Sequence, residues 1–154
     1  MSRHGIAKED GSAGYSLVEL LIVVALATAL LMVAVPGIAR LQQEWTLWGA
    51  ARVLEASMQW GRMHAVAANA PVVFCADDVL QEFYWSDALS GEPYDRSLRH
   101  LPRGIRIAAA PRRPLRFYPH GNAAPAGTYT VAGEAGSYSV VVTPGGRIRI
   151  QKNS

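Results

Sequence analysis

The sequence predicts an α+β fold, in which one long amino-terminal helix, partly in a membrane, packs on a small antiparallel β-sheet domain. Three observations favour this fold. Residues 17–38 form an apolar run long enough to cross a bilayer, and apolar residues continue at helical spacing to about residue 68. Beyond that point, short apolar runs alternate with turns rich in Gly and Pro, which is typical of strands.

The apolar run contains a single ionisable residue, Glu19, among its 22 residues. At about 1.5 Å per residue it spans about 33 Å, enough to cross a hydrocarbon core of about 30 Å. A carboxylate in such a segment costs about 3 kcal/mol at the bilayer centre and less near the end. Glu19 therefore indicates a functional role, and its negative charge requires a positively charged partner. The nearest candidate is an amine placed just before it, on its own chain or on a neighbour.

The residues around Glu19 carry a specific resemblance. The string Gly-Tyr-Ser-Leu-Val-Glu at 14–19, followed by the apolar run, resembles the class III signal of type IV pilins and type II secretion pseudopilins. The resemblance implies that a prepilin peptidase cuts after Gly14 on the cytoplasmic side and N-methylates Tyr15. The family's acid at the fifth mature position falls on Glu19 and its helix-kinking proline on Pro36, so both are expected to serve assembly.

An ordinary signal anchor is the alternative reading of this stretch. A secretory signal peptide is less favoured, because it has a shorter apolar core and a small-residue cleavage site. The leader, residues 1–14, departs from the expected pattern. Its two basic and two acidic residues give a formal charge of zero, so the positive-inside signal is weak.

Helical spacing continues through residues 39–69 as an amphipathic segment, with a kink or local break expected at Pro36 and Gly37. The face expected to pack on the β domain consists of Ile38, Leu41, Trp45, Trp48, Ala51, Leu54, Met58, Gly61 and Ala65. Trp45, Trp48 and Trp60 are interpreted as helix-packing groups. Asn69-Ala70-Pro71 ends the helix.

The junction from Arg62 to Val72 resembles the helix-to-first-strand junction of the GspH/FimT subfamily, in which an Arg, an Ala, an Asn and a following Val recur at this spacing. A second resemblance to this subfamily is the turn from Phe117 to Gly121, which precedes the final strands. Together they imply a minor pseudopilin or minor pilin with a β-rich periplasmic domain at residues 70–154.

After the leader and the membrane run, about 116 residues remain, which is enough for one small domain. The single cysteine, Cys75, excludes an intrachain disulfide, and its apolar neighbours predict a buried structural thiol. The net charge of +3 is unevenly distributed: residues 96–154 carry +9 and residues 15–95 carry −6. This indicates a basic carboxy-terminal surface and an acidic middle, unless the two regions pair within the fold or along a filament.

Seven strands are predicted, with residues 86–95 as a loop. They are residues 72–76, 80–85, 105–109, 115–118, 128–132, 137–143 and 147–151.

The last two strands form a closing hairpin, for which Pro144-Gly145 predicts a type II turn. Alternation then places Arg147 and Arg149 on one face, about 7 Å apart, and the neighbouring isoleucines on the core face. This Gly-Arg-x-Arg string resembles a motif tied to DNA capture in FimT-type minor pilins. Protection of a sheet edge by charge is the alternative interpretation.

The sequence contains no catalytic constellation, nucleophile motif, phosphate loop or metal-ligand spacing, so we expect neither an enzyme nor a cofactor. The expected function is that of a structural minor pseudopilin of a type II secretion filament. A DNA-binding minor pilin of a type IV pilus is the alternative. The expected partners are the prepilin peptidase, other pilin-like subunits, the inner membrane, and a secreted substrate or DNA. The expected location is the bacterial inner membrane, with the carboxy-terminal domain in the periplasm.

Overall fold

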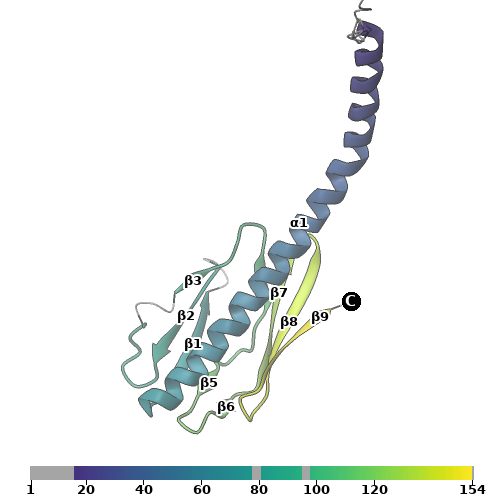
Figure 1. The fold of residues 1–154 in the computed structure, drawn as a ribbon. Helices are drawn as coiled ribbons and strands as arrows, with labels where there is room; N and C mark the ends of the chain where they lie inside the picture. Colours follow the sequence, from purple (N-terminus) through teal and green to yellow (C-terminus); the bar gives the residue numbers. More distant parts are fainter. Residues whose placement is uncertain (1–15, 78–80, 95–97, 154) are drawn as a thin grey trace, which may run out of the picture. The chain divides into compact units, whose positions relative to one another are not determined.

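The structure is a computed structural model that describes residues 16–77, 81–94 and 98–153, without the side chains of residues 33 and 36. One helix is followed by nine strands within these ranges (Figure 1). The elements are α1 (Leu17–Ala68), β1 (Val72–Asp77), β2 (Glu82–Asp87), β3 (Arg99–His100), β4 (Arg106–Ala109), β5 (Arg116–Phe117), β6 (Ala123–Ala124), β7 (Gly127–Gly133), β8 (Gly136–Val142) and β9 (Ile148–Asn153). The chain divides after Ile38 into two compact units, and each is described by itself.

The helix α1 ends at the predicted place. Asn69 has a left-handed backbone with φ of 49°, a conformation that Asn tolerates better than most residues. The Asn69 amide donates to the Val66 oxygen at 3.4 Å, and the Ala70 amide donates to the Ala65 oxygen at 3.2 Å. This pair of bonds is a Schellman motif, which satisfies carbonyl groups that the end of a helix leaves open.

The second half of α1 lies across two antiparallel sheets, with β1–β3 on one side of it and β7–β9 on the other (Figure 1). One sheet has the order β3-β2-β1-β5-β6 and the other has the order β4-β7-β8-β9. A hydrophobic core joins the helix to both sheets. Its largest fully buried side chains are Trp85, Phe74, Phe83, Phe117, Leu47, Leu54, Met58 and Leu115.

The helix face that enters this core differs from the predicted one at its start. Leu47 and Ala50 are buried there, whereas Trp45 and Trp48 are 64% and 40% exposed. The prediction that these two tryptophans pack on the domain is therefore wrong. Trp60 is partly buried against the core, as predicted. Spacings of three and four residues fit several neighbouring stripes of one helix, and only contact with the sheets selects among them.

Gly61 explains how the largest core side chain fits beneath α1. A β-carbon at this position would lie 2.5 Å from the Trp85 indole, so only glycine lets the ring approach the helix this closely. The Trp85 Nε1 atom donates to Ser57 Oγ at 3.0 Å, which pairs the one polar atom of the buried ring. Rings of Phe74 and Phe117 pack on Trp85 with centroid distances of 5.0 and 5.6 Å.

The seven predicted strands are all present, with ends that differ by up to two residues. The two-residue strands β3 and β6 were not predicted, because so short a segment shows no alternation. Of the residues expected to form a loop, 88–90 make a turn, whereas 86 and 87 belong to the end of β2 and Pro93 makes an isolated bridge to Ser86.

The structure bears on the predictions for Cys75 and for the charged regions. Cys75 is half-buried instead of buried, because it faces away from the core side of β1 that Phe74 occupies, and its Sγ lies 3.5 Å from Ser86 Oγ. The acidic and basic regions make contact where Glu82 Oε1 and His100 Nδ1 lie 2.9 Å apart.

Candidate assembly helix and closing hairpin

The first half of α1 is exposed at all of its described positions, and most of the side chains there are apolar. Its most apolar 18-residue window has a mean hydropathy of 2.7, and none of that window is buried. By length and composition this helix can cross a membrane. Leu, Val and Ile side chains exposed on every side of a helix are unfavourable in water, so this segment requires lipid or other apolar helices around it.

Glu19 lies in the first turn of α1 and is exposed. A carboxylate in this position is favoured by the partial positive charge at the amino end of a helix. Gly14 and Tyr15 lie outside the described residues, so cleavage and methylation there stay predictions. Pro36 does not interrupt the helix, which continues unbroken from Leu17 to Ala68. The expected local break is therefore not present, and a kink at Pro36 stays a prediction.

The closing hairpin has the predicted alternation but a different turn. Ile148 and Ile150 pack against the core, and Arg147 and Arg149 are exposed. A type II turn needs a positive φ at Gly145, whereas the positive φ, 76°, falls on Gly146. The Gly146 amide donates to the Thr143 oxygen at 2.9 Å. This pattern matches a three-residue hairpin loop, in which a type I turn is followed by a left-handed residue.

A cluster that the sequence did not predict holds this hairpin to the helix. Arg62 Nε donates to the Gly121 oxygen at 2.9 Å. A β-carbon on Gly146 would collide with that same oxygen and would lie 2.9 Å from Arg62 Nε. The Ala123 amide adds a hydrogen bond to the Pro144 oxygen at 2.9 Å. The only sequence signals were Arg62 and Gly121, which occur in the two resemblances to the GspH/FimT subfamily.

A second cluster orders the loop between β2 and residue 94. Asp87 Oδ1 accepts hydrogen bonds from the Leu89 and Ser90 amides, both at 2.8 Å, and these bonds lower the pKa of Asp87. The Tyr94 ring lies 4.6 Å from the His64 ring, which stacks on Trp60 at 4.8 Å. Burial and the nearby Asp87 carboxylate raise the pKa of Tyr94. The loop is thereby fastened to α1.

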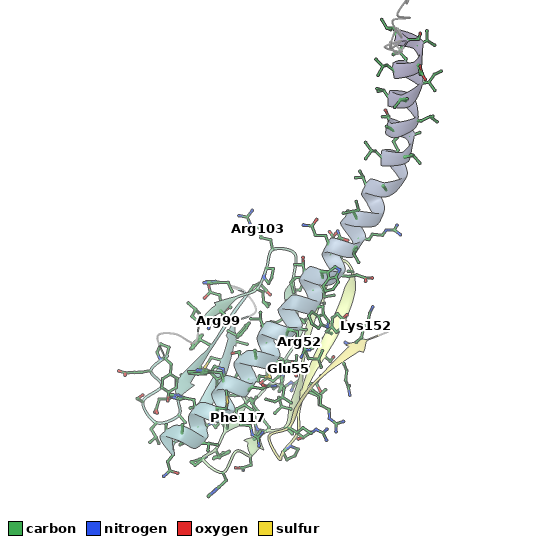
Figure 2. All side chains as sticks on the ribbon, in the orientation of Figure 1. Arg52, Glu55, Arg99, Arg103, Phe117 and Lys152 are labelled. Atoms are coloured by element: carbon green, nitrogen blue, oxygen red, sulfur yellow. The ribbon has the colours of Figure 1, made fainter. Side chains whose placement is uncertain are left out.

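The surface away from the core is rich in basic side chains. Arg99, Arg103 and Lys152 project from it at widely separated places (Figure 2). Among the described residues, no group of three or more His, Cys, Asp or Glu side chains could hold a metal ion.

An amino-terminal helix packed on antiparallel sheets, with an apolar first half, defines the class of pilin-like proteins. The family model described as type II transport protein GspH matches residues 50–146, more than half of the chain. The chain belongs to the GspH family.

Solved structures agree with this fold. The minor pseudopilin EpsH from the type 2 secretion system of Vibrio cholerae has a TM-score of 0.58 at 12% identity, covering 69% of this chain and 96% of its own. The type IV minor pilin FimU of Pseudomonas aeruginosa has a TM-score of 0.57 at 21% identity, covering 68% of this chain and 87% of its own. No curated protein matched this sequence.

Proposed function

We propose that this chain is a structural minor pseudopilin of a type II secretion filament, which transports proteins across the outer membrane. The observation that carries the proposal is the match to the GspH family over the globular part. The apolar half of α1 supports it, because that segment needs a nonpolar environment such as a membrane or a bundle of helices. The role is assembly and involves no catalysis.

In this proposal the peptidase cuts after Gly14 and methylates Tyr15, and the subunit waits in the inner membrane with residues 70–154 in the periplasm. On assembly, Glu19 meets the terminal amine of an adjacent subunit. Two charges that would be uncompensated in an apolar bundle then pair, and the pairing sets the axial register. Residues 15–38 serve as the membrane and assembly segment, and residues 39–69 as the amphipathic segment that carries the domain.

Two measurements test the proposal. Mass spectrometry of the protein from its native membrane should give a mature chain that begins at methylated Tyr15, and an uncut leader would contradict it. Glu19→Ala should abolish incorporation into filaments, assayed by cross-linking to neighbouring subunits. Glu44→Ala, an exposed acid further along α1, is the matched control and should leave incorporation unchanged.

A second candidate function is DNA binding by a minor pilin of a type IV pilus. It is favoured by the exposure of both Arg147 and Arg149 on the same face of the closing hairpin. Their separation of about 7 Å is close to the spacing of successive phosphates along one strand. Arg147→Ala with Arg149→Ala should abolish a salt-dependent mobility shift of duplex DNA. The control, Arg103→Ala with Arg106→Ala, removes the same charge from exposed positions elsewhere. Equal binding by both variants would exclude a specific role for the hairpin.

A further inference from the structure

The outward face of α1 carries a stripe of exposed side chains just beyond the membrane-crossing segment. Leu41 and Trp45 are 55% and 64% exposed, and Trp48 is 40% exposed. With Arg52 they follow spacings of four, three and four residues. At about 100° per residue they fall within a stripe about 60° wide, on a side of α1 that the core residues do not occupy.

The stripe is ordered by its own contacts. The rings of Trp45 and Trp48 meet edge to face, with centroids 6.4 Å apart at 79°. The Arg52 guanidinium lies 4.8 Å from the centre of the Trp48 ring and pairs with Glu55 at 2.8 Å. The stripe therefore combines two amphipathic indole rings with a charged end. We call Trp45 and Trp48 the tryptophan pair.

The tryptophan pair lies at the right distance along the chain for a membrane surface. Counted along the chain, Trp45 follows Leu17, the first residue of α1, by 28 residues, which corresponds to about 42 Å at the helical rise per residue. A bilayer with its headgroups is about 40–45 Å thick. Side chains of a helix lean toward its amino end, so both indoles cover the turn nearer the apolar segment. The length of chain between Leu17 and Trp45 therefore matches the thickness of one bilayer with its headgroups.

The chemistry of the stripe favours a membrane interface over a neighbouring helix. Indole rings collect at the level of lipid headgroups, where the ring is nonpolar and its N–H finds water. The Arg52 guanidinium, whose side chain is 55% exposed, can remain solvated at that level. Packing the same stripe into an apolar bundle of helices would remove water from the Arg52 guanidinium, which is costly.

We propose that the tryptophan pair is an interfacial anchor, which lies among the lipid headgroups on the side of the globular domain. It sets the depth at which the subunit waits before it enters a filament. The inference rests on the proposed membrane-anchored function. The pair must leave the headgroups when the subunit is extracted, so it opposes premature exit from the membrane.

The test uses the full-length protein in vesicles of phosphatidylcholine and phosphatidylglycerol. Some vesicles contain lipids brominated near the headgroup end of the acyl chain, and others contain lipids brominated near its methyl end. Bromine quenches tryptophan emission only at close range. We expect quenching by the shallow bromines to exceed quenching by the deep ones by at least about twofold, as for rings at headgroup level.

Trp45→Phe with Trp48→Phe should remove most of the shallow quenching. Trp60→Phe, which changes a partly buried ring that stacks on His64, is the control and should retain it. The proposed anchor would be overturned if the wild type and the double variant were quenched equally. It would also be overturned if the shallow bromines did not quench, or if the deep bromines quenched more strongly. If bromine did not quench the tryptophan emission, but the emission wavelength shifted when the subunit entered a filament, the stripe would pack on a neighbouring helix and the anchor would be contradicted. A protein that does not sediment with vesicles would instead contradict the membrane-anchored function itself.

Discussion

The Nε atom of Arg62 donates a hydrogen bond to the main-chain oxygen of Gly121, 2.9 Å away and partly buried. This contact joins the second half of α1 to a turn that is 59 residues further along the chain. The turn is closed by the Gly121 amide, which donates to the Tyr118 oxygen at 2.8 Å. Because the closing hairpin packs on the same turn, the contact also determines where Arg147 and Arg149 are presented.

Replacement of Arg62 by Ala should therefore destabilise the globular part by about 1.5–3 kcal/mol, the usual contribution of a hydrogen bond from a charged donor. Urea denaturation of the full chain in detergent, followed by tryptophan emission, measures the change. The control is Arg52→Ala, which removes an ion pair whose arginine side chain is 55% exposed and should cost about 1 kcal/mol or less. Equal losses for the two variants would show that the Gly121 contact contributes little.

Gly146→Ala should destabilise the hairpin strongly. The new β-carbon would collide with the Gly121 oxygen, and the φ of 76° is itself unfavourable for alanine. Left-handed strain alone costs about 1–3 kcal/mol, and the collision adds to it. Gly145→Ala is the matched control, because a β-carbon there meets nothing within 4 Å. Thermal unfolding should separate the two variants, and similar midpoints would contradict this account of the turn.

Two glycines of α1 should respond to alanine with opposite signs. Gly61→Ala places a β-carbon 2.5 Å from the Trp85 indole and should cost about 1–3 kcal/mol through overpacking. Gly49→Ala meets nothing within 4 Å and should stabilise the helix by about 0.5–1 kcal/mol. Denaturation midpoints measure both. A stabilised Gly61→Ala variant would show that Trp85 can move away without loss.

The Asp87 loop should make stability depend on pH in acid. The pKa of Asp87 is lower in the folded protein than its ordinary value of 3.8, because the Ser90 and Leu89 amides stabilise the carboxylate. The ionised Asp87 carboxylate therefore contributes its full stabilisation of the fold above the pKa that Asp87 has in the unfolded chain. This stabilisation is lost as the pH falls through the lower pKa of the folded protein. Asp87→Asn should lower the melting temperature at pH 6 and have a smaller effect near pH 2. Glu92→Gln, an exposed acid in the same loop, is the control. A pH-independent difference between wild type and Asp87→Asn would be inconsistent with this assignment.

Several features could be predicted because they depend on local chemistry. Residues 17–38 must avoid water whatever surrounds them, since every side chain but one is uncharged and most are apolar. Asn69 before Ala-Pro stops a helix by its own conformational preferences. Alternation of Arg and Ile in the last strand separates an outer face from a core face, and the burial of Ile148 and Ile150 confirmed this.

The sequence by itself determined the helix, most of the strands and the family resemblance, because these follow from residue preferences over a few neighbouring positions. Only the tertiary structure decided that Trp45 and Trp48 face outward, that Arg62 reaches Gly121, and that Gly146 carries the left-handed backbone. Each of these depends on which surfaces meet across long separations in the chain. A helical repeat is compatible with several buried stripes, and the sheets select one of them by the volume of the side chains that they present.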